Sequence, residues 1–228
     1  MIIGGLQKCS LIDYPGRIGA IVFTQGCNFR CAYCHNPELV DPARYGPSLT
    51  DEVIPFLEKR RGKLDAVTIT GGEPTLQRDI GPFLREIRGM GYLVKLDTNG
   101  SLPDVLEGLI CSGLVDYVAM DVKAPLEKYE KIAGVKMDTR KIRESIRLIV
   151  KSKIEHEFRT TVVRSQLDPE DLQAIAKLLD KAKLYVLQPF VGLKTLEKKF
   201  LGERSCSPEE FSAILKFMEG KRPRTILR

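Results

Sequence analysis

The stretch "IGAIVFTQGCNFRCAYCHNPEL" (residues 18–39) joins an apolar run to a segment that is rich in cysteine. Residues 18–24 are almost all apolar or β-branched, which predicts a strand that is buried on both faces. Three of the six cysteines in the chain follow between Cys27 and Cys34. The sequence therefore predicts a loop with three thiols directly after a buried strand.

An apolar run followed by a helical pattern recurs along the chain. Besides residues 18–24, the apolar runs are 65–71, 92–98, 115–122, 157–163 and 184–190. The segments with helical periodicity are 48–61, 79–91, 104–114, 139–152, 168–182 and 207–220. We expect Ser48 or Thr50 to cap the first of these helices, and Asp168 with Pro169 to start the fifth.

This alternation predicts an α/β fold with a parallel sheet and right-handed crossovers. Eight strand–helix units would close a TIM-like barrel, whereas six predict a partial (β/α)6 barrel that is open on one side. The length of 228 residues suits a single domain over residues 1–228. In such a fold, the residues that carry chemistry lie at the carboxyl ends of the strands.

Composition and charge exclude several classes of protein. The chain is 43% hydrophobic and 29% charged, which is ordinary for a globular protein. No apolar run approaches the ~20 residues of a transmembrane helix, and the first residues do not resemble a signal peptide. The net charge of +6 is spread along the chain, so we expect solvated helix faces and a basic tail (residues 221–228) rather than a nucleic-acid interface. We therefore expect a cytoplasmic protein.

The three clustered thiols, Cys27, Cys31 and Cys34, have the spacing C-x3-C-x2-C. In a reducing cytosol such a cluster favours metal binding over disulfides. A closed zinc site needs four ligands, whereas a cubane 4Fe–4S cluster on three thiolates keeps one iron open for chemistry. The alternative is a structural zinc or iron–sulfur loop with a distant fourth ligand. Candidates for that ligand are Cys9, Cys111, Cys206 and His156.

Glycines and acidic residues follow the next three predicted strands. They lie in "TGGEP" (70–74), "LDTNG" (96–100) and "MDVKAP" (120–125). Gly71 and Gly72 permit positive φ and close approach of the backbone, in an ordinary turn or in a ligand loop. Asp97 and Asp121 lie in largely apolar runs, and a buried carboxylate needs a partner. Alternatively, Asp97 or Asn99 caps the following helix.

The pattern C-x3-C-x-aromatic-C, with Tyr33 at the aromatic position, resembles the signature of radical S-adenosylmethionine (SAM) enzymes. The resemblance implies that SAM chelates the open iron of the cluster. Reductive cleavage of SAM then gives methionine and a 5′-deoxyadenosyl radical, with no catalytic side chain beyond these cofactors. The GGE motif of the family matches Gly71, Gly72 and Glu73, which implies contacts with the methionyl amine.

Two further strand ends resemble those of pyruvate formate-lyase activating enzymes. The resemblance implies that Asp97 and Asp121 bind a monovalent cation beside SAM, and that Lys123 pairs with the SAM carboxylate. Arg159 either pairs with SAM or a partner's backbone, or forms an ion pair inside the barrel. His35, in a Cys-His-Asn run often seen in glycyl-radical activating enzymes, is expected near a cluster sulfur or the adenine.

The leader "LQKCSLIDYPG" (residues 6–16) resembles anaerobic ribonucleoside-triphosphate reductase activating proteins. That family implies a glycyl-radical enzyme as partner, here the reductase large subunit, and a low-potential electron donor such as flavodoxin or ferredoxin. Two other enzymes stay open. One is an activase of a pyruvate formate-lyase-type enzyme, and the other is a compact enzyme that resembles 7-carboxy-7-deazaguanine synthase and acts on a small molecule. A third alternative is a non-catalytic metal-binding or electron-transfer protein, in which Gly71, Gly72 and Lys123 would have no function.

Overall fold

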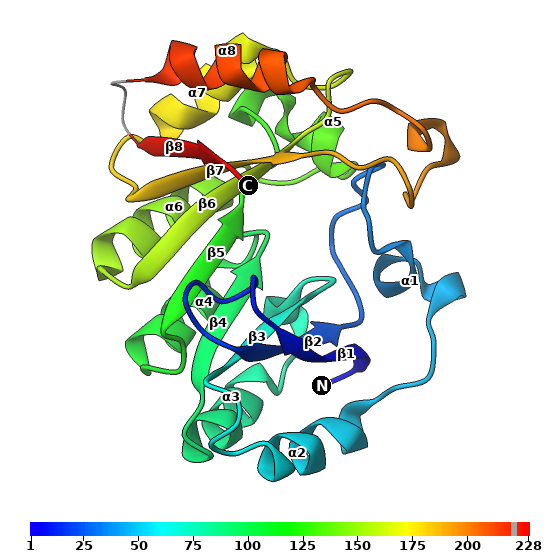
Figure 1. Ribbon diagram of the computed structural model, residues 1–228, viewed down its shortest axis with the longest axis vertical. Coiled ribbons are helices and arrows are strands. Elements are labelled where there is room, and N and C mark those ends of the chain that lie inside the picture. The colour runs from blue at the N-terminus through cyan, green and yellow to red at the C-terminus, as the bar shows by residue number, and fades with distance from the viewer. Residues whose placement is uncertain (220–222) are drawn as a thin grey trace. The chain divides into compact units, whose positions relative to one another are not determined.

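The computed structural model describes residues 1–219 and 223–228 (Figure 1). Its eight strands form one mostly parallel sheet that does not close, and their order follows the chain from β1 to β8. The α/β class that the sequence predicts is therefore confirmed. Residues 220–222 lie outside the described residues. They include the end of the helix expected over 207–220 and the start of the basic tail.

All six predicted apolar runs form strands. They are β2 (Gly19–Thr24), β3 (Ala66–Gly71), β4 (Leu93–Thr98), β5 (Tyr117–Asp121), β6 (Glu155–Val162) and β7 (Leu184–Pro189). The sequence pattern misses β1 (Ile3–Ser10), which is antiparallel to β2, and β8 (Arg224–Leu227), which is parallel to β7. Because β1 contains two adjacent glycines and exposed polar residues, and β8 has four residues, neither shows the apolar run of a buried strand.

The six predicted helical segments also form helices, and two shorter helices join them. The helices are α1 (Pro37–Val40), α2 (Thr50–Lys59), α3 (Ile80–Gly89), α4 (Pro103–Cys111), α5 (Tyr129–Ala133), α6 (Arg140–Ser152), α7 (Pro169–Leu178) and α8 (Pro208–Met218). Asp168 caps α7 as predicted. The predicted N-cap of α2 is wrong, because the N-cap residue is Leu49 and no side-chain bond caps the helix. The Ser48 hydroxyl accepts only from the backbone N–H of Thr50, the first helical residue, at 3.3 Å, and the Thr50 hydroxyl donates to the carbonyl of Met1 at 2.7 Å. None of the described helices combines the length and apolarity needed to cross a membrane.

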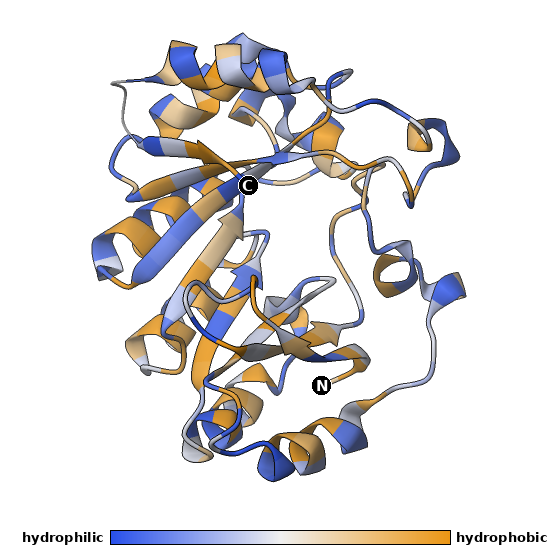
Figure 2. Cartoon of the chain, viewed as in Figure 1, coloured by the Kyte–Doolittle hydropathy of each residue, from blue (hydrophilic) through white to orange (hydrophobic). Residues whose placement is uncertain are grey.

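The chain divides into two compact units. The first consists of Met1–Asn28, Glu38–Thr98 and Leu102–Val118. Its strands β2, β3 and β4 pair in parallel. Completely buried side chains of β3, β4, α2 and α3 form its core, and Figure 2 shows apolar and polar residues alternating along both helices. These side chains are Val53, Leu57, Val67, Ile69, Leu84, Ile87, Val94 and Leu96.

The second unit consists of Phe29–Pro37, Asn99–Ser101 and Ala119–Arg228. Its strands β6, β7 and β8 pair in parallel, and α7 and α8 lie on the same side of β7 and β8 (Figure 1). The ring of His156 packs edge-on against Phe158 at 5.6 Å. The single domain over residues 1–228 stays a prediction.

Candidate cofactor site

Cys31 and Cys34 lie on one tight turn in the second unit. The backbone N–H of Cys34 donates to the carbonyl of Cys31 at 3.0 Å, and that of Arg30 donates to Ala133, at the end of α5, at 2.8 Å. Gly134 follows α5 with a φ of 69°, and a Cβ there would lie 2.3 Å from the carbonyl oxygen of Arg30. Real Cβ atoms essentially never come within 3.0 Å of another heavy atom, so only glycine fits here.

The segment that follows β7 contacts the same turn. The backbone N–H of Glu197 donates to the carbonyl of Ala32 at 2.9 Å, and Nε2 of His35 lies 3.0 Å from the carbonyl oxygen of Val191. The His35 ring stacks on Phe190 with centroids 5.2 Å apart. Protein contacts therefore hold the cysteine loop in place. A role of His35 beside a cluster sulfur or the adenine stays a prediction.

Tyr33 lies between the two cysteines of this turn in sequence, and its ring meets Phe190 edge-on at 6.2 Å. Burial raises the pKa of Tyr33 well above its usual value, so the hydroxyl stays protonated. This hydroxyl is buried and has no hydrogen-bond partner among the described residues. Because a buried polar group without a partner costs free energy, the atom fits a site that receives a polar ligand.

Asp121, at the end of β5, forms a charged cluster with Lys123 and Arg159. Its Oδ2 accepts from Nζ of Lys123 at 2.9 Å, and its Oδ1 accepts from Nε of Arg159 at 2.8 Å. Burial alone would raise the pKa of Asp121, but the charges of Arg159 and Lys123 outweigh it and hold the pKa well below its usual range. Of the two roles expected for Arg159, the structure contains the ion pair with an acidic residue of the sheet.

Lys123 also joins this charged cluster to the cysteine loop. Burial works against its ammonium group, yet the Asp121 carboxylate raises the pKa of Lys123 well above its usual value. Burial raises the pKa of the Cys31 thiol to about 11, and the charge of Lys123 partly offsets that increase. Binding of a metal by this thiol must therefore release a proton. Within the second unit, the charges of Lys123 and Asp121 therefore act on the Cys31 thiol and the Tyr33 hydroxyl.

In the first unit, Gly71 and Gly72 pack against the backbone that leads to Cys27. Gly71 has a φ of 111°, and a Cβ at Gly72 would lie 2.0 Å from the carbonyl oxygen of Gly26. The backbone N–H of Glu73 donates to that same oxygen at 2.8 Å. The glycines therefore allow the end of β3 to approach the backbone before the first cysteine. Their contact with the methionyl amine of SAM stays a prediction.

Glu73 is completely buried and connects the ends of two strands. Its Oε1 accepts from the backbone N–H of Thr75 at 3.1 Å and from the Thr75 hydroxyl at 2.5 Å. The hydroxyl of Thr98, the last residue of β4, donates to the same oxygen at 2.7 Å. Glu73 therefore fixes the glycine turn relative to the strand that carries Asp97.

Asp97 is 8% exposed, and its Oδ1 accepts from Nζ of Lys95 at 2.6 Å. The alternative that Asp97 or Asn99 caps the following helix is wrong, because the N-cap of α4 is Leu102 and no side chain caps it. Instead, Oδ1 of Asn99 accepts from the backbone N–H of Ser101 at 2.9 Å. The sequence pattern does not single out Lys95, the partner of Asp97, although a lysine inside the apolar run 92–98 is a visible signal.

The candidates for a distant fourth metal ligand lie in varied surroundings. Cys9 and Cys111 are exposed, and Cys206 is half-buried. Burial, together with the charge of Glu210, raises the pKa of the Cys206 thiol. Both ring nitrogens of His156 face backbone groups, at 2.8 and 3.4 Å. This argues against His156 as a ligand.

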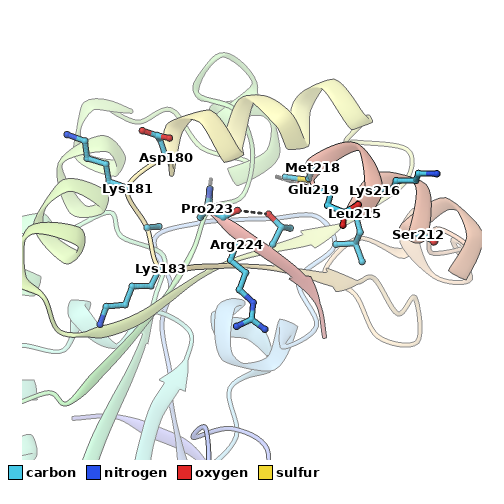
Figure 3. Close-up of a pocket in the computed structure, with 12 residues that line it drawn as sticks. Asp180, Lys181, Lys183, Ser212, Leu215, Lys216, Met218, Glu219, Pro223 and Arg224 are labelled. Atoms are coloured by element: carbon cyan, nitrogen blue, oxygen red, sulfur yellow. Dashed lines mark hydrogen bonds between the residues drawn. The ribbon is translucent and has the colours of Figure 1, made fainter. Parts of the chain in front are cut away.

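A cavity of about 900 Å³ in the second unit lies at the starts of β7 and β8 (Figure 3). Its lining comes from the turn between α7 and β7, which includes Lys183, from α8, and from the start of β8, which includes Arg224. Asp121 and Phe190, in contrast, lie at the carboxyl ends of β5 and β7. The cavity is therefore not the candidate cofactor site.

Comparison with known proteins agrees with the cysteine pattern. Residues 21–182 match the radical SAM superfamily. A Methanocaldococcus jannaschii protein, described as a candidate glycyl-radical enzyme activating enzyme, is 36% identical over 206 residues, which cover 87% of this chain and 84% of the relative. A 7-carboxy-7-deazaguanine synthase of Thermococcus kodakarensis is 28% identical over 207 residues, which cover 82% of this chain and 79% of the relative.

Among solved structures, the fold is similar to Streptococcus suis SuiB bound to its precursor peptide SuiA. The TM-score is 0.70 at 12% identity, and the match covers 91% of this chain and 48% of SuiB. The chain thus spans about half the length of SuiB, and this likeness shows the fold alone.

The chain therefore belongs to the radical SAM superfamily, in the group of glycyl-radical enzyme activating enzymes. It is a radical SAM enzyme, and the cofactors of this family are a 4Fe–4S cluster and SAM. The resemblance drawn from the cysteine spacing is confirmed.

Proposed function

We propose that the chain uses SAM to generate a glycyl radical on a partner protein, the large subunit of an anaerobic ribonucleoside-triphosphate reductase. The observation that carries the activase function is the 36% identity, over 87% of the chain, to a relative named for that activity. The choice of the reductase rests on the leader, residues 6–16, which resembles the activating proteins of that enzyme.

We assign the cluster to Cys27, Cys31 and Cys34. Their thiol chemistry and spacing suit iron, and the unpartnered hydroxyl of Tyr33 suits a polar ligand beside it. When bound and reduced, the cluster supplies the electron that splits the S–C5′ bond of SAM. We propose a reducing cytoplasm as the place of the reaction, because it keeps the thiols available for iron.

In the second unit, Lys123 is the group that we propose for the SAM carboxylate. Its ammonium donates to Asp121, which also accepts from Arg159. When Lys123 turns to a ligand, Asp121 therefore keeps one cationic partner. This lowers the cost of the exchange, since removing the sole partner of a buried charge is strongly destabilising.

In the first unit, we propose that the backbone of Gly71 and Gly72 meets the methionyl amine. The Oε1 atom of Glu73 accepts from Thr75 and Thr98, so the Glu73 side chain supports this turn from within. Its contribution to SAM binding is therefore to fix the direction of the backbone groups. Asp97 lies at the end of the adjacent strand and belongs to the same part of the proposed site.

The decisive experiment mixes the reduced, cluster-loaded chain with SAM and the candidate reductase under anaerobic conditions. We expect a glycyl doublet in the electron paramagnetic resonance spectrum, and none when the candidate glycine of the reductase is replaced by alanine. Cys34→Ser in this chain is the matched control, because it removes one proposed iron ligand. Reduced flavodoxin or ferredoxin should replace the chemical reductant. A silent spectrum with the reductase, together with normal SAM binding, would contradict the proposed partner.

A second candidate function is a small-molecule reaction like that of the 7-carboxy-7-deazaguanine synthases. The similarity to the Thermococcus kodakarensis synthase over 82% of the chain favours it. This candidate predicts turnover of a small molecule in the absence of any protein partner. The same anaerobic mixture, analysed for modified small molecules in place of a protein radical, separates the two functions.

A further inference from the structure

The first unit contains a buried lysine, Lys95, to which the proposed function gives no role. Lys95 lies in the middle of β4 and is 1% exposed, which is rare for a lysine. Side chains alternate along a strand, so Lys95 and Asp97 share one face of the sheet, and Thr68 lies opposite Lys95 in register on β3. Val94 and Leu96 occupy the other face and are completely buried. The lysine therefore points away from the apolar layer that these two residues form.

Two neighbouring groups stabilise the ammonium of Lys95, a carboxylate and an aromatic ring. Its Nζ lies 2.6 Å from Oδ1 of Asp97 and 5.9 Å from the centre of the Tyr117 ring. A carboxylate neutralises the ammonium directly, and the face of an aromatic ring attracts a cation within about 6 Å. These two contacts therefore fix the position of the Lys95 ammonium beside Asp97.

This arrangement bears on the monovalent cation that Asp97 and Asp121 were expected to bind. In the first unit Asp97 already has the ammonium of Lys95, and in the second unit both oxygens of Asp121 already accept from basic side chains. A further cation on either carboxylate would lie within a few ångströms of a fixed positive charge and would be repelled. The residues present do not fit the external cation.

We propose that Lys95 is a positioning residue that supplies Asp97 with the positive charge of a monovalent cation, so that SAM binding requires no added potassium or sodium. The inference rests on the proposed placement of Asp97 in the SAM site. An ammonium tethered to β4 carries one unit of charge, as a potassium ion does. Unlike an ion, it needs no capture from solution, and it keeps the buried carboxylate neutralised at any salt composition.

The first test needs no variant. SAM is titrated into the cluster-loaded chain under anaerobic conditions in potassium, sodium or N-methyl-D-glucamine chloride at equal ionic strength. We expect the three dissociation constants to agree within about 2-fold, because the tethered ammonium does not depend on the salt. A tenfold change would correspond to ~1.4 kcal/mol of cation binding energy. A loss of 10-fold or more in the organic salt would overturn the proposal.

The second test asks whether SAM binding requires a dissolved cation once the ammonium of Lys95 is removed. Lys95→Met leaves Asp97 without its ammonium, so SAM affinity should fall in the organic salt and recover at least partly in potassium or sodium. Lys95→Met combined with Asp97→Asn removes both charges and should show no such recovery. Lys63→Met is the matched control for loss of a lysine, since Lys63 is exposed in the same unit. SAM affinity of Lys95→Met that equals the wild type in every salt would overturn the proposal.

If Lys95→Met does not fold, the wild-type titration and the charge-free double variant still decide the question.

Two outcomes of the wild-type titration relate this inference to the proposed function. If the wild type binds SAM equally in all three salts but gives no glycyl doublet with the reductase, the partner is wrong and the role of Lys95 stands. If it binds SAM in none of them, the placement of Asp97 beside SAM fails, and the role of Lys95 fails with it.

Discussion

Replacing Lys123 with methionine should weaken SAM binding and leave the 4Fe–4S cluster in place. Methionine keeps an unbranched side chain and removes the charge, so the loss of affinity reports on the ammonium group. A charge-assisted hydrogen bond contributes ~1.5–3 kcal/mol, which is roughly 10- to 150-fold in affinity. Because Lys123 already donates to Asp121 at 2.9 Å, part of that gain is cancelled by the exchange of partners. We therefore expect a value near the lower end, about 10-fold.

The fold should tolerate this substitution because Arg159 also donates to Asp121, at 2.8 Å. Removing the sole partner of a buried charge costs ~3–5 kcal/mol, and the second cation should limit the loss to about 1–2 kcal/mol. Arg159→Met is the informative counterpart. Asp121 would then hold Lys123 more tightly, so SAM affinity should fall in that variant as well.

The assay is a calorimetric titration of SAM into the cluster-loaded protein under anaerobic conditions, with iron content and thermal unfolding measured on the same samples. Lys131→Met is the matched control, because Lys131 is exposed and lies in the same unit. Unchanged SAM affinity in Lys123→Met, with about four irons bound, would refute the assignment of Lys123 to the SAM carboxylate. Loss of iron would also refute it, since the lysine would then serve the cysteine loop.

Three further predictions follow from the contacts of the site. Gly72→Ala should destabilise the chain by more than ~4 kcal/mol or prevent folding, because the new Cβ would lie 2.0 Å from the carbonyl oxygen of Gly26. In the control Gly89→Ala, at the end of α3, the new Cβ meets no atom within 4 Å, so Tm should stay unchanged or rise slightly because alanine favours the helix. Serine at each isolated cysteine should leave about four irons per chain in an iron assay. Those cysteines are Cys9, Cys111 and Cys206. Because the pKa of Asp121 is lowered in the fold, its ion pairs stabilise the chain above the usual carboxyl pKa and lose that contribution as the pH falls through the lowered value. Asp121→Asn should therefore flatten the fall of Tm below pH ~4 and leave its pH dependence between about 5 and 9 unchanged.

The six inner strands could be predicted because a strand covered on both faces appears in sequence as a continuous apolar run. β3 and β4 illustrate this, since nearly all of their residues are buried. β1 could not be predicted in the same way. It contains Gly4 and Gly5, and its place in the sheet comes from pairing with β2 rather than from its own composition.

The cysteine loop shows a similar division between spacing and contacts. The spacing of the thiols and the aromatic position of Tyr33 are properties of a short stretch, and they sufficed to predict the class of cofactor. The contacts that hold the loop join residues far apart in the chain, such as Arg30 with Ala133 and Ala32 with Glu197. No local pattern indicates them, because one partner is the end of helix α5 and the other lies in the segment after β7.

Some charge pairs of the site join residues close together in the sequence, and one joins residues far apart. Lys95 and Asp97 lie two residues apart in β4, so the alternation of side chains along a strand places both on one face and makes their pairing predictable. Lys123 lies beyond the end of β5 and pairs with Asp121 from the loop that follows the strand. Arg159 reaches Asp121 from β6, and nothing near Asp121 in the sequence indicates which basic residue will do so. A strand-end aspartate that resembles a ligand for an external cation can thus already be neutralised in the fold. A lysine two residues away is the signal to examine before such a cation is assigned.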